Sequence, residues 1–174
     1  MSMKIKTINL LRHAKSSWSD PLLEDIDRPL NKRGENAARF MAGQIATTGC
    51  RFEHIYCSPA QRAVTTLEII ADQLSDRDIH WQIDNSLYTF DHYDLIDWLT
   101  RVDDSIAELL IVGHNPALTR LSNAIGSSPV TNIPTCGFIR LVSAGQCNWR
   151  QIENCHFETT AILKPKLLMK SAQG

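Results

Sequence analysis

Cationic and hydroxyl side chains follow a predicted buried strand near the start of the chain. The stretch INLLRHAKSSW (8–18) runs from five strand-like residues into His13, Lys15 and two serines, with Arg12 as the last strand residue. A strand that simply turns at the surface usually ends in Gly, Asn, Asp or Pro. Arginine and histidine instead supply donors suited to phosphate oxygens. This turn is therefore either a solvated loop or the floor of an anion site.

Two further segments place similar chemistry after predicted strands. CSPAQR (57–62) brings Arg62 to the start of a predicted helix, and VGHNP (112–116) brings His114 to the end of a buried strand. Each motif alone is weak, because a single arginine or histidine is usually a surface or turn residue. In open α/β sheets, however, ligands bind at the carboxyl ends of the strands, and helix N-termini there add positive potential. Two arginines and two histidines at one such edge indicate phosphate chemistry.

The elements that position these residues alternate along the chain. Apolar runs and alternating patterns predict strands over residues 4–12, 54–57, 79–83, 108–112 and 161–163, and a hairpin of strands over 138–142 and 149–152. Apolar residues at helical spacing and local cap signals predict helices over residues 31–48, with Asn31 as the N-cap, 59–74, 93–102 and 116–125. This order predicts a three-layer α/β/α sandwich with a mostly parallel sheet and an antiparallel edge.

Composition limits the classes of function. The 174 residues predict a single domain over 1–174, with residues 165–174 as a frayed tail. A formal net charge of −1 argues against a broad nucleic-acid or membrane surface. The first residues, MSMKIK, lack the apolar run of a signal peptide, so we expect a cytoplasmic protein. Five cysteines without a CxxC pair predict reduced thiols.

The motifs as a set resemble the histidine phosphatase superfamily, which includes the phosphoglycerate mutases, and within it the SixA-like phosphohistidine phosphatases. The matching segments, in order and spacing, are LLRHAKSSW, DRPLNKRG, SPAQRAVTT, VGHNP and the C-terminal KPKLL. The resemblance implies a phosphoglycerate mutase-like fold with His13 as the nucleophile. It implies that Arg12, Arg62 and His114 complete the phosphate pocket. Arg28, in DRPL, matches a further arginine that reaches the phosphate.

The implied roles agree with the chemistry of the side chains. Neutral imidazole is a nucleophile, and a phosphorylated His13 would divide one difficult displacement into two. Arg12 and Arg62 can each present a planar fork to phosphate oxygens. His114 can donate to a transferring oxygen as its charge is redistributed. We expect neither a metal nor a cofactor, because the histidines lack metal-ligand spacing such as HExxH.

The chain departs from the family pattern at two positions. Ala14 stands where the motif is usually Arg-His-Gly, a change that the SixA-like branch tolerates. In SLYTFDHYD (86–94), Thr89 stands where many relatives carry the glutamate that serves as general acid. Asp91 is the nearest carboxylate that could replace it. The alternative is that Asp91 caps the helix that begins near Tyr93.

The missing glutamate bears on the substrate. An alkoxide leaving group benefits from a positioned acid by about 10²–10⁴-fold, whereas imidazole leaves a protonated phosphohistidine as a neutral molecule. The segment between Tyr93 and the strand at 108–112 has room for one helix and not for a capping insertion. Both features favour a phosphohistidine-bearing protein, such as a phosphotransfer protein, as the partner.

Three other functions stay open from the sequence. A cysteine phosphatase built on Cys57 and Arg62 would need five residues between them, and this chain has four, with Pro59 removing an amide. A non-catalytic adaptor could bind phosphohistidine without turnover, although the intact His13 argues against it. A small-molecule phosphomonoesterase or mutase of the same superfamily would use the same pocket on a small phosphorylated substrate.

Overall fold

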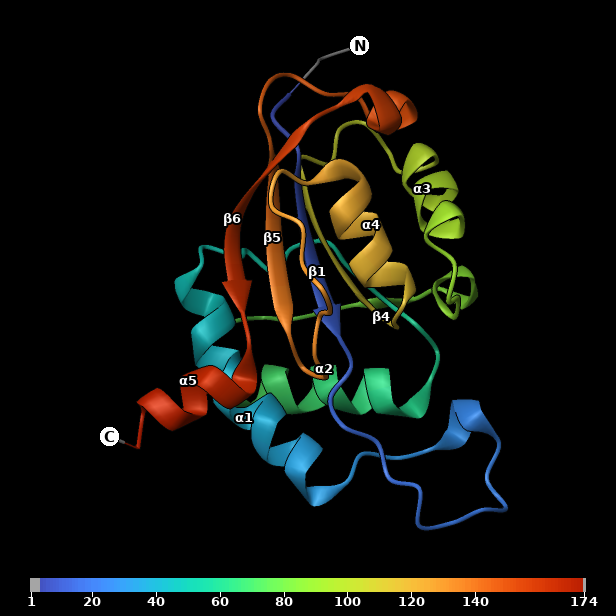
Figure 1. Ribbon diagram of the computed structural model, residues 1–174, viewed down its shortest axis with the longest axis vertical. Helices are drawn as coiled ribbons and strands as arrows, with labels where there is room; N and C mark the ends of the chain where they lie inside the picture. The colour runs from blue at the N-terminus through green and yellow to red at the C-terminus, as the bar shows by residue number, and fades with distance from the viewer. Residues whose placement is uncertain (1–3, 174) are drawn as a thin grey trace.

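A mixed six-stranded sheet lies at the centre of the computed structural model (Figure 1). The structure describes residues 4–173. The strands, in the sheet order β3-β2-β4-β1-β5-β6, are β3 (Gln82–Ile83), β2 (Ile55–Cys57), β4 (Glu108–Gly113), β1 (Thr7–Arg12), β5 (Phe138–Ser143) and β6 (Phe157–Leu163). The first four pair in parallel, whereas β5 pairs antiparallel with both of its neighbours, β1 and β6. The predicted sheet is therefore confirmed. Residues 1–3 and 174, which belong to the predicted single domain, lie outside the described residues.

Helices cover both faces of this sheet. They are α1 (Lys32–Thr47), α2 (Gln61–Gln73), α3 (His92–Thr100), α4 (Ala117–Ile125) and α5 (Pro165–Ser171), with short 3-10 turns η1 (Asp25–Asp27), η2 (Asn85–Leu87) and η3 (Trp149–Asn154). Successive side chains of a strand point to opposite faces. Leu10 of β1 accordingly packs with the core beneath α3 and α4, and Leu11 packs with the core beneath α1 and α2. The three predicted layers follow from this alternation.

The start of α1 is attached to the turn that follows β1. Asn31 caps the helix, since its Oδ1 accepts the Gly34 N–H at 2.9 Å, and its own N–H donates to the Lys15 carbonyl at 2.9 Å. A Cβ at Gly34 would lie 2.2 Å from that same carbonyl oxygen. Glycine therefore allows the helix to approach the turn closely, which confirms the predicted cap and places α1 beside the cationic segment.

Three segments differ from the sequence predictions. The tail predicted to fray instead forms α5, because Pro165 is buried at its first turn and Leu168 packs against the core beneath α1 and α2. The predicted strand at 149–152 is instead η3, since Asn148 caps it and the buried Trp149 donates from Nε1 to a backbone carbonyl, that of Ile106, at 2.8 Å. The strand predicted over 79–83 is reduced to the two residues of β3.

The prediction of five reduced thiols is wrong in this structure. Cys147 and Cys155 form a disulfide, with their Cα atoms 5.9 Å apart. The segment between β5 and β6 folds back on itself and brings the two cysteines together. No short cysteine motif in the sequence predicts that contact. Cys50, Cys57 and Cys136 are buried free thiols. Within residues 4–173, no helix combines the length and the apolar character needed to cross a membrane.

Candidate active site

The five residues predicted to bind phosphate line one pocket. Arg12 ends β1 and His13 directly follows it, Arg62 lies in the first turn of α2, and His114 directly follows β4. Arg28 comes from the loop that precedes α1 and faces the same pocket, whose volume is about 340 Å³. Parallel strands bring their carboxyl ends to one edge, and this edge carries the pocket. The structure thus brings the predicted site residues together.

His13 is held as a neutral imidazole. It is 8% exposed, and its Nδ1 lies 2.7 Å from the carbonyl oxygen of Ala14. A carbonyl only accepts, so Nδ1 carries the proton and Nε2 keeps its lone pair. Burial, together with the positive charges of Arg62 and Arg12, lowers the pKa of His13 to about 4 against the opposing effect of the Ala14 contact. The Nε2 lone pair is therefore available at neutral pH.

Arg62 connects the two histidines. Its side chain is almost fully buried, and its Nε donates to His13 Nε2 at 3.3 Å. Its Nη2 lies 3.4 Å from His114 Nδ1. Nη1 donates to the backbone carbonyl of Asp25, and Nη2 also lies 2.9 Å from Asp25 Oδ2. One guanidinium group thus orients both imidazoles toward the pocket.

His114 is deeper than His13 and is also neutral. It is 1% exposed, and its Nε2 lies 2.7 Å from Ser58 Oγ. Because a guanidinium group can only donate, the Arg62 contact makes His114 Nδ1 the acceptor and leaves the proton on Nε2. Burial, together with the neighbouring His13 and Arg62, lowers the pKa of His114 to about 3.

Arg12 and Arg28 complete the cationic wall. Arg12 donates from Nη1 to the Ile133 carbonyl at 2.8 Å, while its buried Nε has no hydrogen-bond partner among the described residues. Arg28 donates from Nε to the Ser17 carbonyl at 3.1 Å. Its guanidinium group stacks on the exposed Trp18 ring, 3.2 Å from the ring centroid. The unpartnered Arg12 Nε is a donor that a bound anion could satisfy.

Asp25 is a pocket residue that the sequence reasoning missed. Its carboxylate accepts from Tyr88 Oη at 2.6 Å, from Arg62 Nη2 at 2.9 Å and from Arg28 Nη1 at 2.8 Å. Burial raises its pKa, but these hydrogen bonds outweigh the effect and lower it to about 2. The i,i+3 spacing of Asp25 and Arg28 in DIDR is a local signal that could have revealed the pair. Contact with Arg62 and Tyr88 could not be foreseen from spacing.

Asp91 caps a helix and does not line the pocket. Its Oδ1 accepts the Tyr93 N–H at 3.0 Å, which is the N-cap contact of α3. Thr89, which stands in place of the family glutamate, donates instead to Asp94 Oδ2 at 2.5 Å. Of the two roles that the sequence left open for Asp91, the structure supports the cap. Among the described residues, Asp25 is the single carboxylate that lines the pocket.

Cys57 has the properties of a core thiol. It is fully buried at the end of β2, and burial raises its pKa to about 12. The thiolate is the nucleophilic form of cysteine, and this environment disfavours it. Cys57 is also absent from the pocket lining. No group of three or more His, Cys, Asp or Glu side chains within residues 4–173 is arranged to hold a metal ion.

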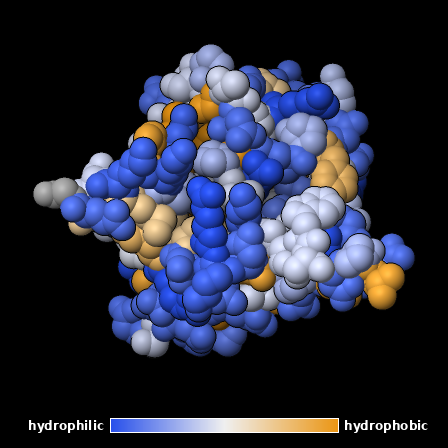
Figure 2. Space-filling model, turned by 60° about the horizontal axis from the view of Figure 1, so that its bottom comes forward, coloured by the Kyte–Doolittle hydropathy of each residue, from blue (hydrophilic) through white to orange (hydrophobic). Residues whose placement is uncertain are grey.

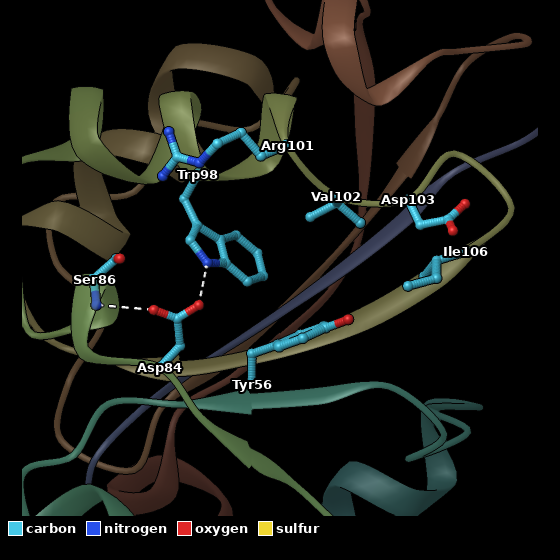
Figure 3. A pocket seen from close by; sticks show the side chains of 8 residues that line it. All are labelled: Tyr56, Asp84, Ser86, Trp98, Arg101, Val102, Asp103 and Ile106. Atoms are coloured by element: carbon cyan, nitrogen blue, oxygen red, sulfur yellow. Dashed lines mark hydrogen bonds between the residues drawn. The ribbon is translucent and has the colours of Figure 1, made fainter.

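A second cavity, between α3 and the β2–β3 side of the sheet, has different chemistry (Figure 3). It has a volume of about 290 Å³. Trp98 donates from Nε1 to Asp84 Oδ2 at 2.8 Å, and Asp103 adds a second carboxylate to a lining whose single cation, among the described residues, is Arg101. Two carboxylates against one cation make this cavity unfavourable for a phosphate dianion. The pocket around His13 is therefore the candidate active site.

Comparison with known proteins points to one family. Residues 8–95 match the family described as the histidine phosphatase superfamily (branch 1). An uncharacterized protein of Mycobacterium tuberculosis (strain ATCC 25618 / H37Rv) is 30% identical over 159 residues, covering 82% of this chain and 92% of that protein.

Solved structures share the fold. The protein histidine phosphatase SixA complexed with tungstate has a TM-score of 0.74 at 20% identity, covering 93% of this chain and 99% of that chain. A phosphoglycerate mutase from Bacillus anthracis str. Sterne has a TM-score of 0.59 at 14% identity, covering 80% of this chain and 88% of that one. The expected phosphoglycerate mutase-like fold is therefore confirmed.

Proposed function

Because the chain belongs to the histidine phosphatase superfamily, we propose that it is a phosphatase that acts through a phosphorylated His13 and removes phosphate from phosphohistidine on a protein. The observation that carries this proposal is the neutral His13, with its Nε2 lone pair directed at Arg62 inside a pocket of three arginines. A nucleophile beside converging guanidinium groups is the arrangement that phosphoryl transfer needs.

The proposed reaction has two displacements. In the first, His13 Nε2 attacks phosphorus, a P–N bond forms to the enzyme, and the bond to the leaving group breaks with its electron pair. In the second, water attacks the phosphorus of phospho-His13, the P–N bond to His13 breaks, and phosphate is released. Arg12, Arg28 and Arg62 would offset the charge on the phosphoryl oxygens. His114 lines the deep side of the pocket and would donate to an oxygen only if the bound dianion protonated it, because in this structure Arg62 and Ser58 occupy both of its ring nitrogens.

The absence of a protonated acid in the pocket favours a P–N substrate. The pKa of Asp25 is lowered to about 2, so its carboxylate is ionised at neutral pH and cannot give a proton to a leaving group. Asp91 is occupied as a helix cap. A protonated phosphohistidine releases a neutral imidazole and needs no such proton, whereas an alkyl phosphate does.

The entrance to the pocket is compatible with a substrate carried by a folded protein. Only residues 84–91 connect β3 to α3 at the carboxyl ends of the strands, so no inserted subdomain covers the sheet edge at that point. Trp18 and Phe90 at the mouth are both exposed. An exposed apolar rim around a cationic centre is typical of a surface that meets another macromolecule.

The cytoplasmic location predicted from the sequence stays a prediction. Reducing conditions in a cytosol would open the Cys147–Cys155 disulfide. Neither cysteine lines the candidate pocket, so the proposed chemistry does not depend on that bond. The proposed mechanism also uses no metal and no cofactor.

A phosphate-release assay on three substrates tests the proposal. We expect rapid release from a phosphohistidine-bearing phosphotransfer protein, measurable release from an aryl phosphate, and slow release from a phosphosugar. EDTA should leave the rates unchanged, and tungstate should inhibit by occupying the phosphate site. A preference for the phosphosugar would contradict the substrate proposal and favour a small-molecule phosphatase. Binding of the phosphohistidine protein without any phosphate release would favour an adaptor.

A further inference from the structure

Another concavity lies directly beside the candidate active site. It lies between the start of α1 and the C-terminal helix α5 and has a volume of about 520 Å³. Lys15 and Thr135 line both this concavity and the pocket around His13. We call it the α1–α5 groove. A ligand bound at His13 can therefore reach the groove past the exposed side chain of Lys15.

The groove carries uncompensated positive charge. Four cationic side chains line it, namely Lys15, Arg33, Lys166 and Lys170, and none of its lining residues is acidic. Within residues 4–173, no ion pair neutralises any of the four. The chain as a whole has a net charge of −1, so this concentration is local. An exposed cluster of one sign attracts a ligand of the opposite sign.

The groove also offers apolar surface between its cations. Ala37, Pro134, Pro165 and Met169 line it, whereas the four cations are all exposed. Figure 2 shows the end of the molecule that carries α1 and α5, where hydrophilic side chains cover most of the surface and apolar patches lie between them. The candidate active site is different, because its arginines converge and Arg28 and Arg62 are buried.

This difference indicates which anionic ligand fits. A second phosphate group of a small molecule is best held by converging, desolvated donors, which the groove lacks. Flexible, exposed lysines around an apolar floor instead match a peptide segment that alternates carboxylates with apolar side chains.

We propose that the α1–α5 groove binds an acidic, partly apolar segment of the protein that carries the phosphohistidine. The segment would lie in the groove while the phosphorylated side chain enters the pocket at His13. This inference rests on the proposed function for the phosphorylated substrate, but the binding of the acidic segment can be measured separately. Lys166 and Lys170 are specificity-determining residues in this proposal, because they are positioned to contact the segment and not the phosphate.

Backbone contacts of α1 and side-chain packing of α5 hold the walls of the groove in place. Asn31 binds the Lys15 carbonyl, and Gly34 allows the close approach of α1 to that residue. Pro165 is buried, and Leu168 packs against the core beneath α1 and α2. Substitution of the exposed Lys166 and Lys170 therefore changes the charge of the groove and leaves these packing contacts in place.

The test uses two synthetic phosphohistidine peptides that differ only in their flanking residues, one with glutamates and one with glutamines, each interspersed with leucine. The readout is the ratio of kcat/KM for the Glu peptide to that for the Gln peptide. We expect a ratio of about ten for the natural protein, equivalent to about 1.4 kcal/mol, and a lower ratio at high salt. The variant K166E/K170E should bring the ratio to about one or below. The matched control R120E/R150E makes the same charge change at exposed positions outside the groove and should keep the ratio.

A second measurement separates the groove from the proposed activity. Fluorescently labelled Glu and Gln peptides without phosphate are titrated with each protein, and binding is followed by anisotropy. We expect the natural protein and R120E/R150E to bind the Glu peptide more tightly than K166E/K170E does. If charge reversal destabilises α5, K166Q/K170Q should give an intermediate loss without that change.

The outcomes assign failure to one proposal or the other. Preferred binding of the Glu peptide without hydrolysis of either phosphohistidine peptide would overturn the proposed function and support the groove. Equal binding of the Glu and Gln peptides by the natural protein would overturn the groove proposal. Inhibition by an alkyl bisphosphate that depends on Lys166 and Lys170, with peptide binding that does not, would also overturn it and assign the groove to a small molecule.

Discussion

Two clusters that combine arginine with a carboxylate lie at opposite ends of the parallel strands β1 and β4. They differ in how fully the charges within the cluster compensate one another. At the amino ends, Glu108 of β4 is surrounded by donors. At the carboxyl ends, Asp25 faces the arginines of the candidate active site. The clusters use similar residue types, so their difference shows which property marks a binding site.

The Glu108 cluster is internally satisfied. Its carboxylate accepts from Arg140 Nη1 at 2.8 Å, from Asn9 Nδ2 at 3.0 Å and from the Arg51 N–H at 3.1 Å. Burial raises the pKa of Glu108, but these hydrogen bonds outweigh it and lower the pKa below its ordinary value. None of the buried side-chain atoms of this network within residues 4–173 lacks a hydrogen-bond partner, and we interpret the network as a support of the sheet.

The candidate active site has more cations than its one carboxylate can satisfy. Arg12, Arg28 and Arg62 line the pocket with Asp25, and the buried Nε of Arg12 is unpartnered among the described residues. The excess of positive charge is unfavourable for the protein alone and favourable once an anion binds. An unbalanced cluster therefore marks the site, whereas a balanced one marks structure.

The largest expected effect is the loss of activity when His13 becomes alanine. Removal of the nucleophile should lower phosphate release by at least about 10³-fold, because the covalent step is lost. Thermal unfolding should change little, since no other residue depends on His13 for its only hydrogen bond. In the natural protein, acid-labile and base-stable phosphate should be trapped on His13 during turnover. Release at the natural rate by His13→Ala would contradict both the mechanism and the contrast between the clusters.

The opposite result is expected for Glu108→Gln. This change leaves Arg140 largely buried without a counter-charge, which should lower the free energy of unfolding by roughly 3 kcal/mol. The rate of phosphate release per folded molecule should stay the same, because the candidate pocket lies at the other end of the strands. Chemical denaturation and an assay below the unfolding transition measure the two quantities. A stable but inactive Glu108→Gln protein would contradict the interpretation that the Glu108 cluster supports the fold and not the activity.

The pH dependence of kcat/KM should report the lowered pKa of His13 in the candidate active site. Protonation of His13 removes the Nε2 lone pair, and its pKa is lowered to about 4. After correction for the ionisation of an aryl phosphate substrate, kcat/KM should stay nearly constant from about pH 7 to about pH 5 and fall as the pH drops through about 4. An ordinary histidine would instead lose activity below about pH 6.5. A fall near that higher value would show that burial and the arginines do not keep His13 neutral.

The smallest effect is expected for Asp91→Asn. Asparagine caps helices about as well as aspartate, so stability should change by less than about 0.5 kcal/mol. Phosphohistidine and aryl phosphate hydrolysis should both be unchanged, because Asp91 lies outside the pocket lining. A selective loss of about 10²-fold on an alkyl phosphate would identify Asp91 as an acid and would assign the enzyme to small-molecule substrates.

Local patterns in the sequence were sufficient for most of the fold. The buried run at 108–112 predicts β4 because apolar continuity needs only neighbouring residues, and Asn31 predicts the start of α1 because a cap acts within one turn. The second strand of the predicted hairpin, at 149–152, is not formed. Tryptophan favours strands, but Trp149 is buried in a 3-10 turn, where it donates to the Ile106 carbonyl. Tertiary packing overrode local propensity there.

Four of the five predicted site residues could be identified from the sequence because each lies next to the end of a strand or the start of a helix, whereas Arg28 was predicted only from the resemblance of DRPL to the family. The α/β order then determines that these ends meet at one edge of the sheet. Arg12, Arg62 and His114 reach the pocket by this rule.

Other features were decided only by the tertiary structure, because they join segments that no local pattern relates. Asp25 meets Arg62 and Tyr88 across 37 and 63 residues of sequence. Cys147 and Cys155 form a disulfide only because the segment between β5 and β6 folds back. The segment at 165–171 becomes helical because Pro165 finds a buried position beside α1, and that packing places Lys166 and Lys170 next to the candidate active site. Such long-range contacts depend on the free energy of the whole packed chain, which a short stretch of sequence does not contain.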